Sequence, residues 1–491
     1  MPEEIMVQDG LAPYHFAGMV YNPSKSALNS QAQRLLLIGR YEPKEGEAPG
    51  EGLQQMTSLN KIAEIYPNSD SEIVKMLKAS FEANPMVERY AIAVTDKDSV
   101  KPSWEFSFSE TGEEIKDGSL LLGICGLDPI NVEFKASEFA EKEGEVEANK
   151  TKVLIAKIKK TLDGIKDLGY KTEQNESNLT LTCSRYIDNG NHLSLGIELD
   201  VPGFSVKRTA FKSGFNASKN LSEALSKLPE MQFTQIASSF NSKEDIILAN
   251  EELERRWGPT LQLDGHYFTA IHGGVNKIKE TYSDNGNVLD ELKHVTVMGV
   301  SDSNDSSAVW AASLAAMNSL YALKPYLPYH SLPIPGVKAP ETEYTLAQRD
   351  MLLKLGISTH VAESRKAKID RLVTMHSKDW SYRDLNKKQI LSYLRYDFVK
   401  FLKSMYPRSA LSKDDTQADG DVATPKSARD LAIARHMRWK QEKFVQDPDG
   451  SFKNNVDVRV DENNGETLRF FLPVQLMGQM RRTVTTIAFT P

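Results

Sequence analysis

The sequence predicts a multidomain α+β protein with a central α/β domain, an inserted β-rich module and a C-terminal α+β domain. The first observation is length: 491 residues correspond to three or so domains at about 100–200 residues each. The second is that apolar strands alternate with amphipathic helices over 30–100 and again over 202–340, as in the βαβ units of a parallel sheet. The third is a change, between these two stretches, to short segments that alternate in polarity.

The first half of the central domain, residues 30–100, begins with a buried strand, RLLLIG from Arg34. A helix is expected next, because Ile73, Leu77 and Phe81 recur at the spacing of one helical face. Pro85 ends that helix, and the next apolar strand is RYAIAV. Strand, helix and strand in this order predict a parallel pair of strands.

The second half, residues 202–340, continues the same pattern. The helix after the strand QFTQIASSF has Ser242 and Asp245 placed as a capping box, and Gly258 ends it. Two more apolar strands follow, YFTAIHGG and HVTVMGV, and then a helix rich in small residues. The proline-rich stretch 324–340 is interpreted as a stiff connection between two bodies.

Residues 101–201 are predicted to form a separate α+β module inserted into the central domain. WEFSF alternates in polarity, residues 153–168 form an amphipathic helical pattern, and LTLTCSRYI and HLSLGIELDV are strand-like. The chain has two cysteines, Cys125 and Cys183, both flanked by strand-like residues. We expect both to be buried thiols, because two cysteines are too few for a metal site and a disulfide needs an oxidising compartment.

Residues 341–478 are predicted to form the C-terminal α+β domain. A helix ending at Gly356 precedes two alternating strands that are joined by the charged turn ESRK. A long helix follows, and Thr424 and Pro425 mark the start of another. The face of the long helix is formed by Ile390, Leu394, Phe398 and Leu402.

The two ends of the chain, residues 1–29 and 479–491, are predicted to be extended arms. The first contains prolines and shows no helical period, and the second ends in the β-branched, apolar segment TVTTIAFTP. A strand needs partners for its backbone N–H and C=O groups. Each arm must therefore pair either within its own chain or with another chain, and the pattern alone leaves both open.

Composition narrows the class of protein. Lys and Arg number 60 against 67 Asp and Glu, so the formal net charge is -7, and no basic run indicates a nucleic-acid partner. No apolar run approaches the ~18–20 residues of a membrane span, so membrane insertion is not expected. The N-terminus MPEEIMVQDG lacks a basic region, which argues against a secretory signal and for folding in a cytoplasm.

Residues that could carry chemistry are few, and no catalytic, cofactor-binding or metal site is predicted. The chain lacks the Walker, dinucleotide-binding, nucleophile-elbow and zincin motifs. The best enzymatic candidate is DGHYFTAIHGG, in which His266 or His272 could act as a base beside a backbone oxyanion donor at Gly273. The alternative function is therefore a cytosolic hydrolase-like enzyme, and a pH-dependent interface at His360 and His376 is a further possibility.

Several segments carry a resemblance to a known family when they are read in order. They are QRLLLIGR, ELERRWGPTLQLDGHYFTA, HVTVMGV, LPIPGV, RDMLLKLGI, KIDRLVTMHS, ILSYLRYDFVKFLKSMYPRSAL, ATPKSARDLAIARHMRW and VQLMGQMRRTVTTIAFTP. In this order they resemble the tail sheath protein of Mu-like contractile phages over most of the chain, least in the inserted module. One departure is the turn ESRKA, where that family tends to have a glycine.

The resemblance implies a structural role without catalysis. Sheath proteins stack as hexameric rings, in a helical stack around a tail tube, and contraction drives the tube through the host envelope. The expected partners are copies of the same chain, the tail tube protein, and baseplate and tail terminator proteins, without direct nucleic-acid contact. The expected location is the virion tail, assembled in the cytoplasm of the host bacterium, with residues 101–201 facing outward.

The resemblance also implies that the arms complete the sheet of the C-terminal domain in neighbouring subunits. The arms would bend at Ala12–Pro13, at Asn22–Pro23 and around Gly478. The strands at 357–375 would form part of that shared sheet. The residues expected to pair between subunits are Val7, Phe16, Val20, Thr359, Val361, Ile369, Val373, Val484, Thr486, Ile487 and Phe489.

Overall fold

The computed structural model describes residues 28–43, 50–95, 103–124, 129–140, 149–165, 170–183, 195–208, 217–284, 287–301, 303, 305–340, 342–378, 380–419, 421–481 and 483–488. The chain divides into two compact units. The central unit is Ala32–Gln389, and the C-terminal unit is Ile390–Pro491 together with the N-terminal stretch that ends at Gln31. The division falls inside helix α10 (Leu385–Met405).

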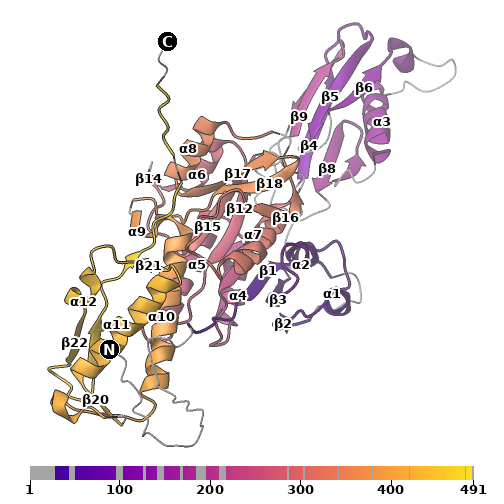
Figure 1. Ribbon diagram of the computed structural model, residues 1–491. Coiled ribbons are helices and arrows are strands. Elements are labelled where there is room, and N and C mark those ends of the chain that lie inside the picture. The colour runs from indigo at the N-terminus through magenta and orange to yellow at the C-terminus, as the bar shows by residue number, and fades with distance from the viewer. Residues whose placement is uncertain are drawn as a thin grey trace, which may run out of the picture. The chain divides into compact units, whose positions relative to one another are not determined.

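The central unit is built on a nine-stranded sheet (Figure 1). Its strands β3, β1, β11, β12, β15 and β17 are neighbours and run parallel, while β2, β18 and β16 are antiparallel to their neighbours. The predicted parallel pairing of RLLLIG with RYAIAV is confirmed. In sheet order the strands are β16 (Pro333–Lys338), β18 (Lys366–Arg371), β17 (Ile357–Glu363), β15 (Val295–Val300), β12 (Tyr267–His272), β11 (Gln235–Ser238), β1 (Arg34–Arg40), β3 (Glu88–Val94) and β2 (Leu53–Gln55).

Helices cover both faces of this sheet, because its strands are apolar on both sides. Alternate residues of β1 show this: Leu35 and Leu37 join one core, while Leu36 and Ile38 join the other. The first core includes α1 (Leu59–Ile65), α2 (Glu72–Ala83) and α7 (Ser307–Tyr321). The second includes α4 (Ala217–Ser226), α5 (Lys243–Trp257), α6 (Val275–Thr281) and α8 (Leu346–Lys354). Smaller elements of the unit are β13 (Ser283–Asp284), β14 (Asn287–Val288) and α9 (Trp380–Arg383).

The domain boundary differs from the one expected at residue 341. The strands 357–363 and 366–371 extend the central sheet, because β17 pairs with β15 in parallel and β18 pairs with β17. The stretch 324–340, expected to be a linker, contains the edge strand β16 instead. An edge strand tolerates Pro333 and Pro335, because an N–H that faces away from the sheet needs no ladder partner.

Both edges of the central sheet are poorly suited to further pairing. The two prolines of β16 remove backbone donors, and Gly336 has a φ of +83°, which breaks the regular strand. At the other edge, β2 has only 3 residues. Strand addition from another chain is therefore disfavoured at either edge of this sheet.

The inserted module, residues 103–208, forms a core of its own inside the central unit. Two antiparallel sheets, in the orders β10-β4-β8-β7 and β6-β5-β9, enclose this core together with α3. The side chain of Cys183 and the whole of Cys125 lie outside the described part. The elements are β4 (Ser103–Glu110), β5 (Gly118–Ile124), β6 (Ile130–Phe134), η2 (Ala136–Phe139), α3 (Lys150–Asp163), β7 (Tyr170–Gln174), β8 (Asn178–Cys183), β9 (Leu195–Asp200) and β10 (Phe204–Arg208).

The C-terminal unit combines helices with strands that are short. Its two main helices are the later part of α10 and α11 (Pro425–Gln441), which begins with the predicted Pro425 after the N-cap Thr424. The remaining elements are β19 (Ala410–Leu411), η3 (Asp415–Gln417), β20 (Val422–Ala423), β21 (Val445–Gln446), α12 (Ser451–Asn455), β22 (Asp457–Val460), β23 (Leu468–Phe471) and β24 (Gln475–Leu476).

Candidate assembly site

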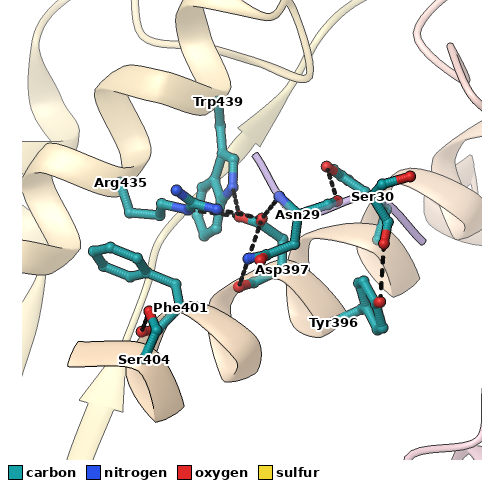
Figure 2. A network of polar contacts seen from close by, with 9 residues as sticks. Asn29, Ser30, Tyr396, Asp397, Phe401, Ser404, Arg435 and Trp439 are labelled. Atoms are coloured by element: carbon teal, nitrogen blue, oxygen red, sulfur yellow. Dashed lines mark hydrogen bonds and ion pairs between the residues drawn. The ribbon is translucent and has the colours of Figure 1, made fainter. Parts of the chain in front are cut away.

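A buried carboxylate, Asp397 on α10, holds together three parts of the C-terminal unit. From α11, Arg435 Nε donates to Oδ2 at 2.7 Å and Trp439 Nε1 donates to the same oxygen at 2.6 Å. From the N-terminal stretch, Asn29 donates to Oδ1 through its backbone N at 2.8 Å and through Nδ2 at 3.0 Å. Figure 2 shows these donors converging on the carboxylate. Asp397 is 0% exposed, so its charge depends on these contacts.

The local sequence explains this arrangement. Asp397 lies on the apolar face of α10 that also carries Ile390 and Leu394, and a charge in that position must find a partner. Arg435 and Trp439 lie four residues apart on α11, so they project from the same face toward it. A guanidinium that contacts both carboxylate oxygens is the strongest partner available to a buried acid.

Two tyrosines of α10 add to the attachment of the N-terminal stretch. Tyr393 donates its hydroxyl to the carbonyl of Asn29 at 2.9 Å, and Tyr396 donates to the carbonyl of Ser30 at 3.0 Å. Burial, and after it the charge of Asp397, raises the pKa of Tyr393, so this hydroxyl remains a donor at neutral pH. The chain that precedes Asn29 therefore starts from a fixed point on the C-terminal unit.

The C-terminal segment 483–488, unlike the attached N-terminal stretch, is exposed to solvent. All of these residues are exposed, including Val484 at 94% and Ile487 at 88%. Within the described residues they belong to no strand and form no hydrogen bond or ion pair (Figure 1). β-Branched and apolar side chains favour a pleated, half-buried surface, so this segment has strand character without a strand partner.

The strands of the C-terminal unit are also incompletely paired. In the described part of the chain they form two-stranded sheets, β19–β20, β21–β24 and β22–β23. A two-stranded sheet leaves one edge of each strand open and is at best marginally stable alone. The β21–β24 pair is of particular interest, because β24 is the strand nearest in sequence to the exposed C-terminal segment, with residues 477–482 between them.

The residues expected to pair between subunits divide into three groups in the structure. Val7, Phe16, Val20 and Phe489 lie outside the described residues. Val484, Thr486 and Ile487 are exposed and have no strand partner among the described residues. The remaining residues, in the strands near 357–375, belong to the central unit.

This last group has partners within the same chain, which differs from its expected role. Thr359 pairs with Arg371, and Val361 pairs with Lys368 across the β17–β18 hairpin. Ile369 is buried and pairs with His360, while the backbone N of Val373 donates to Ser358 Oγ at 2.9 Å. The alternation of these residues matched a strand correctly, but the pattern could not specify which sheet the strand joins.

The sequence patterns do not predict the polar network formed by Asp397, Arg435, Trp439 and Asn29. The sequence does indicate that Asp397 is buried, because the residue stands seven positions after Ile390 on an otherwise apolar helical face. A buried acid of this kind requires a basic partner elsewhere. The identity of that partner, 38 residues later, is not encoded in any local spacing.

The two histidines of the alternative enzymatic hypothesis do not form a common site. His266 immediately precedes β12 and His272 is its last residue, so the two lie about 20 Å apart at the rise of a strand. His266 Nε2 lies 2.8 Å from Thr296 Oγ1, and burial lowers the pKa of His266 well below its usual value. His272 Nε2 lies 3.0 Å from the carbonyl oxygen of Asp305. Each imidazole is thus engaged in a structural hydrogen bond.

Among the residues that the structure describes, no group of three or more His, Cys, Asp or Glu side chains is arranged to hold a metal ion. No helix in the same described part is both long and apolar enough to cross a bilayer. The features that remain for a functional interpretation are the anchored N-terminal stretch and the unpaired C-terminal segment.

Comparison of sequences gives a relative that matches nearly the whole chain. No protein-family model matches. The chain is 25% identical over 473 residues to the Mu-like prophage FluMu tail sheath protein of Haemophilus influenzae, which covers 93% of this chain and 92% of that protein. The match therefore includes both units.

Solved structures with a similar arrangement have much lower sequence identity. A sheath tail protein from Desulfitobacterium hafniense has 10% identity and a TM-score of 0.49, covering 94% of this chain and 97% of the other. The helical sheath of the anti-feeding prophage in its contracted state has 11% identity and a TM-score of 0.48, covering 97% and 98%. The sequence comparison with the Haemophilus protein confirms the predicted resemblance of this chain to Mu-like tail sheath proteins.

Proposed function

We propose that this chain is the structural subunit of a contractile tail sheath, which polymerises as stacked hexameric rings around a tail tube. Similarity over 93% of the chain to a tail sheath protein supports this role. Contraction of the polymer drives the tube through the host envelope. The partners are further copies of the chain, the tube protein, and baseplate and terminator proteins, in a virion tail assembled in the host cytoplasm.

The observation that carries the proposal is the exposed segment 483–488. It has strand-forming side chains, and in the described part of the chain it has no hydrogen-bonding partner. Leaving such a segment in solvent invites pairing with another chain. In an assembled sheath, a neighbouring subunit provides the missing partner by strand addition.

The acceptor for this strand is the β21–β24 pair of a neighbouring subunit. Both strands have an open edge among the described residues, whereas the edges of the central sheet are short or contain proline. The N-terminal arm, held at Asn29, supplies a second strand to another neighbour. The pairing residues are Val7, Phe16 and Val20 in one arm and Val484, Thr486, Ile487 and Phe489 in the other.

Contraction uses a difference in packing between two arrangements of the same subunits. Burying an additional ~300 Å² of apolar surface per subunit would contribute about 7.5 kcal/mol, at about 25 cal/mol per Å². The arms keep their strand pairing during the change and bend near Ala12–Pro13, Asn22–Pro23 and Gly478, so that neighbouring subunits remain connected.

Proline substitutions in the C-terminal arm test the proposal. Proline at Val484 or Thr485 removes a backbone donor from the added strand, so at least one of Val484→Pro and Thr485→Pro should abolish polymerisation. The folded subunit should keep its stability, because both residues are exposed and unpaired in the described structure. Sedimentation measures the polymer, and thermal unfolding measures the fold.

The matched controls are Val484→Thr and Thr485→Ser, which keep the backbone donor and should polymerise as the parent chain does. Deletion of residues 482–491 should give a folded chain that does not polymerise. The proposal is contradicted if both proline variants and the deletion variant polymerise normally, or if the parent chain stays monomeric at every concentration tested.

A further inference from the structure

The outer face of one sheet in the inserted module is acidic. In the β6-β5-β9 sheet, Leu120 and Leu122 point into the core, so the residues between them point outward. Every charged residue on these three strands is acidic: Glu133, Glu198 and Asp200. All three are exposed. We call the surface formed by these three residues the acidic face.

The strand register places these carboxylates around one central strand. Ser119 of β5 pairs with Glu133 on one side and with Asp200 on the other, so the two acids lie about 10 Å apart. Leu121 pairs with Glu198 and is itself 41% exposed. None of the three carboxylates forms an ion pair with another described residue. The acidic face therefore has a small apolar centre and unbalanced charge.

The solvent side of helix α3 in the same module is basic. Apart from Asp163, its charged residues are lysines. Lys157 is paired with Glu138 and Lys159 with Asp163. In contrast, Lys150, Lys152 and Lys160 form no ion pair within the described residues, and they define the basic face. Lys152 and Lys160 are exposed and lie about 12 Å apart along the helix axis.

We propose that the acidic face of one subunit docks against the basic face of a second copy of this chain, so that inserted modules of neighbouring subunits contact each other in the polymer. The proposal rests on the proposed function. The two faces carry opposite unbalanced charges and have similar dimensions, about 10 Å and about 12 Å. Complementary charge of this kind selects a partner and fixes its register.

The two faces are different surfaces of one chain, and this determines the type of assembly. A contact between unlike surfaces is heterologous, and repetition of such a contact produces a closed ring or an open helix rather than a two-fold dimer. Both outcomes suit a subunit that forms rings and stacks. Because the charges are exposed, the contact should weaken with added salt, since the screening length falls from about 10 Å at 0.1 M to about 3 Å at 1 M.

Charge reversal in the full-length chain tests the proposal. Glu198→Lys with Asp200→Lys makes the acidic face basic, and Lys152→Glu with Lys160→Glu makes the basic face acidic. Each double variant should raise the critical concentration for polymerisation by about tenfold at low salt, because like charges then meet. The quadruple variant, which reverses both faces, should return to within about threefold of the parent chain. At 1 M salt, all four proteins should converge.

The control is Lys171→Glu with Lys207→Glu, which changes the net charge by the same amount as Lys152→Glu with Lys160→Glu, within the same module but outside α3. It should polymerise as the parent chain does, and thermal unfolding should be unchanged for every variant because the altered side chains are exposed. The inference is overturned if the double variants polymerise normally at low salt, or if the quadruple variant is as impaired as they are. A parent chain that never polymerises contradicts the proposed function itself, and the inference with it.

Discussion

Asp397 places a negative charge inside the C-terminal unit, and Arg435 is the cation that balances it. The side chains of both are at most 1% exposed, so neither charge can be solvated if the other is lost. The same carboxylate accepts hydrogen bonds from Asn29, so it also contributes to the attachment of the N-terminal stretch, together with Tyr393 and Tyr396. The stability of the C-terminal unit and the position of Asn29 therefore both depend on Asp397.

Asp397→Asn should destabilise the C-terminal unit by about 3–5 kcal/mol, because the substitution leaves the guanidinium of Arg435 buried without its counter-charge. Chemical unfolding followed by tryptophan fluorescence measures the change. Trp439→Phe removes a single donor to the same oxygen and should cost less, about 1–3 kcal/mol. Equal stability of Asp397→Asn and the parent chain would contradict this account of the network.

His360 makes the stability of the central unit depend on pH. Burial, with smaller contributions from His272 and Arg349, lowers the pKa of His360 to about 4. Within the described residues neither ring nitrogen has a hydrogen-bond partner, so nothing there offsets the cost of protonation. The unfolded chain, with a pKa of about 6.5, binds the proton first as the pH falls.

The free energy of unfolding should therefore be highest above about pH 6.5 and fall as the pH decreases toward 4, by up to about 3 kcal/mol from this residue. His266, whose pKa is also lowered by burial, acts in the same direction. Urea unfolding at a series of pH values measures the slope. His360→Gln should reduce the slope between pH 6 and 4, and an unchanged slope would exclude this role for His360.

At the scale of elements, helix ends are the features that the sequence specifies most completely. Ser242 and Asp245 form the predicted capping box at the start of α5, and Gly258 is its C-cap. Thr424 and Pro425 likewise mark the start of α11. These signals are local, because each cap satisfies backbone groups within one turn of the helix.

Ser242→Ala should lower the stability of the central unit by about 1 kcal/mol, because the side chain no longer accepts from the backbone N of Asp245. Thermal unfolding measures this change. Ser242→Thr keeps an acceptor at the same position and should retain most of the stability. The capping assignment is wrong if the alanine variant unfolds at the same temperature as the threonine variant and the parent chain.

The sequence predicts that a strand exists more reliably than it predicts which sheet the strand joins. The alternation of residues 357–371 gave two strands correctly, but the structure pairs them with β15 and with the proline-containing β16 in the central sheet. Period-2 alternation reports which residues face a core and not which strand lies alongside. The same limit applies to Asp397, whose partner Arg435 lies on a different helix.

At the scale of the whole molecule, the central unit has covered cores, whereas the C-terminal unit has strands that are incompletely paired in its described part. Both faces of the central sheet are covered by helices, and its edges are short or contain proline. The C-terminal unit instead has two-stranded sheets and an exposed terminal segment in its described part. Assembly is expected to use this incomplete β-structure, while the rest of the subunit moves as rigid bodies during contraction.

We expect segment 483–488 to complete the β21–β24 sheet of an adjacent copy. Electron microscopy of the polymer formed by the purified chain, at a resolution that separates strands, tests this most directly. We expect a helical tube in which the segment is hydrogen-bonded to a strand edge of a neighbouring subunit. A polymer in which the segment folds back on its own chain, or remains unpaired, would contradict the claim.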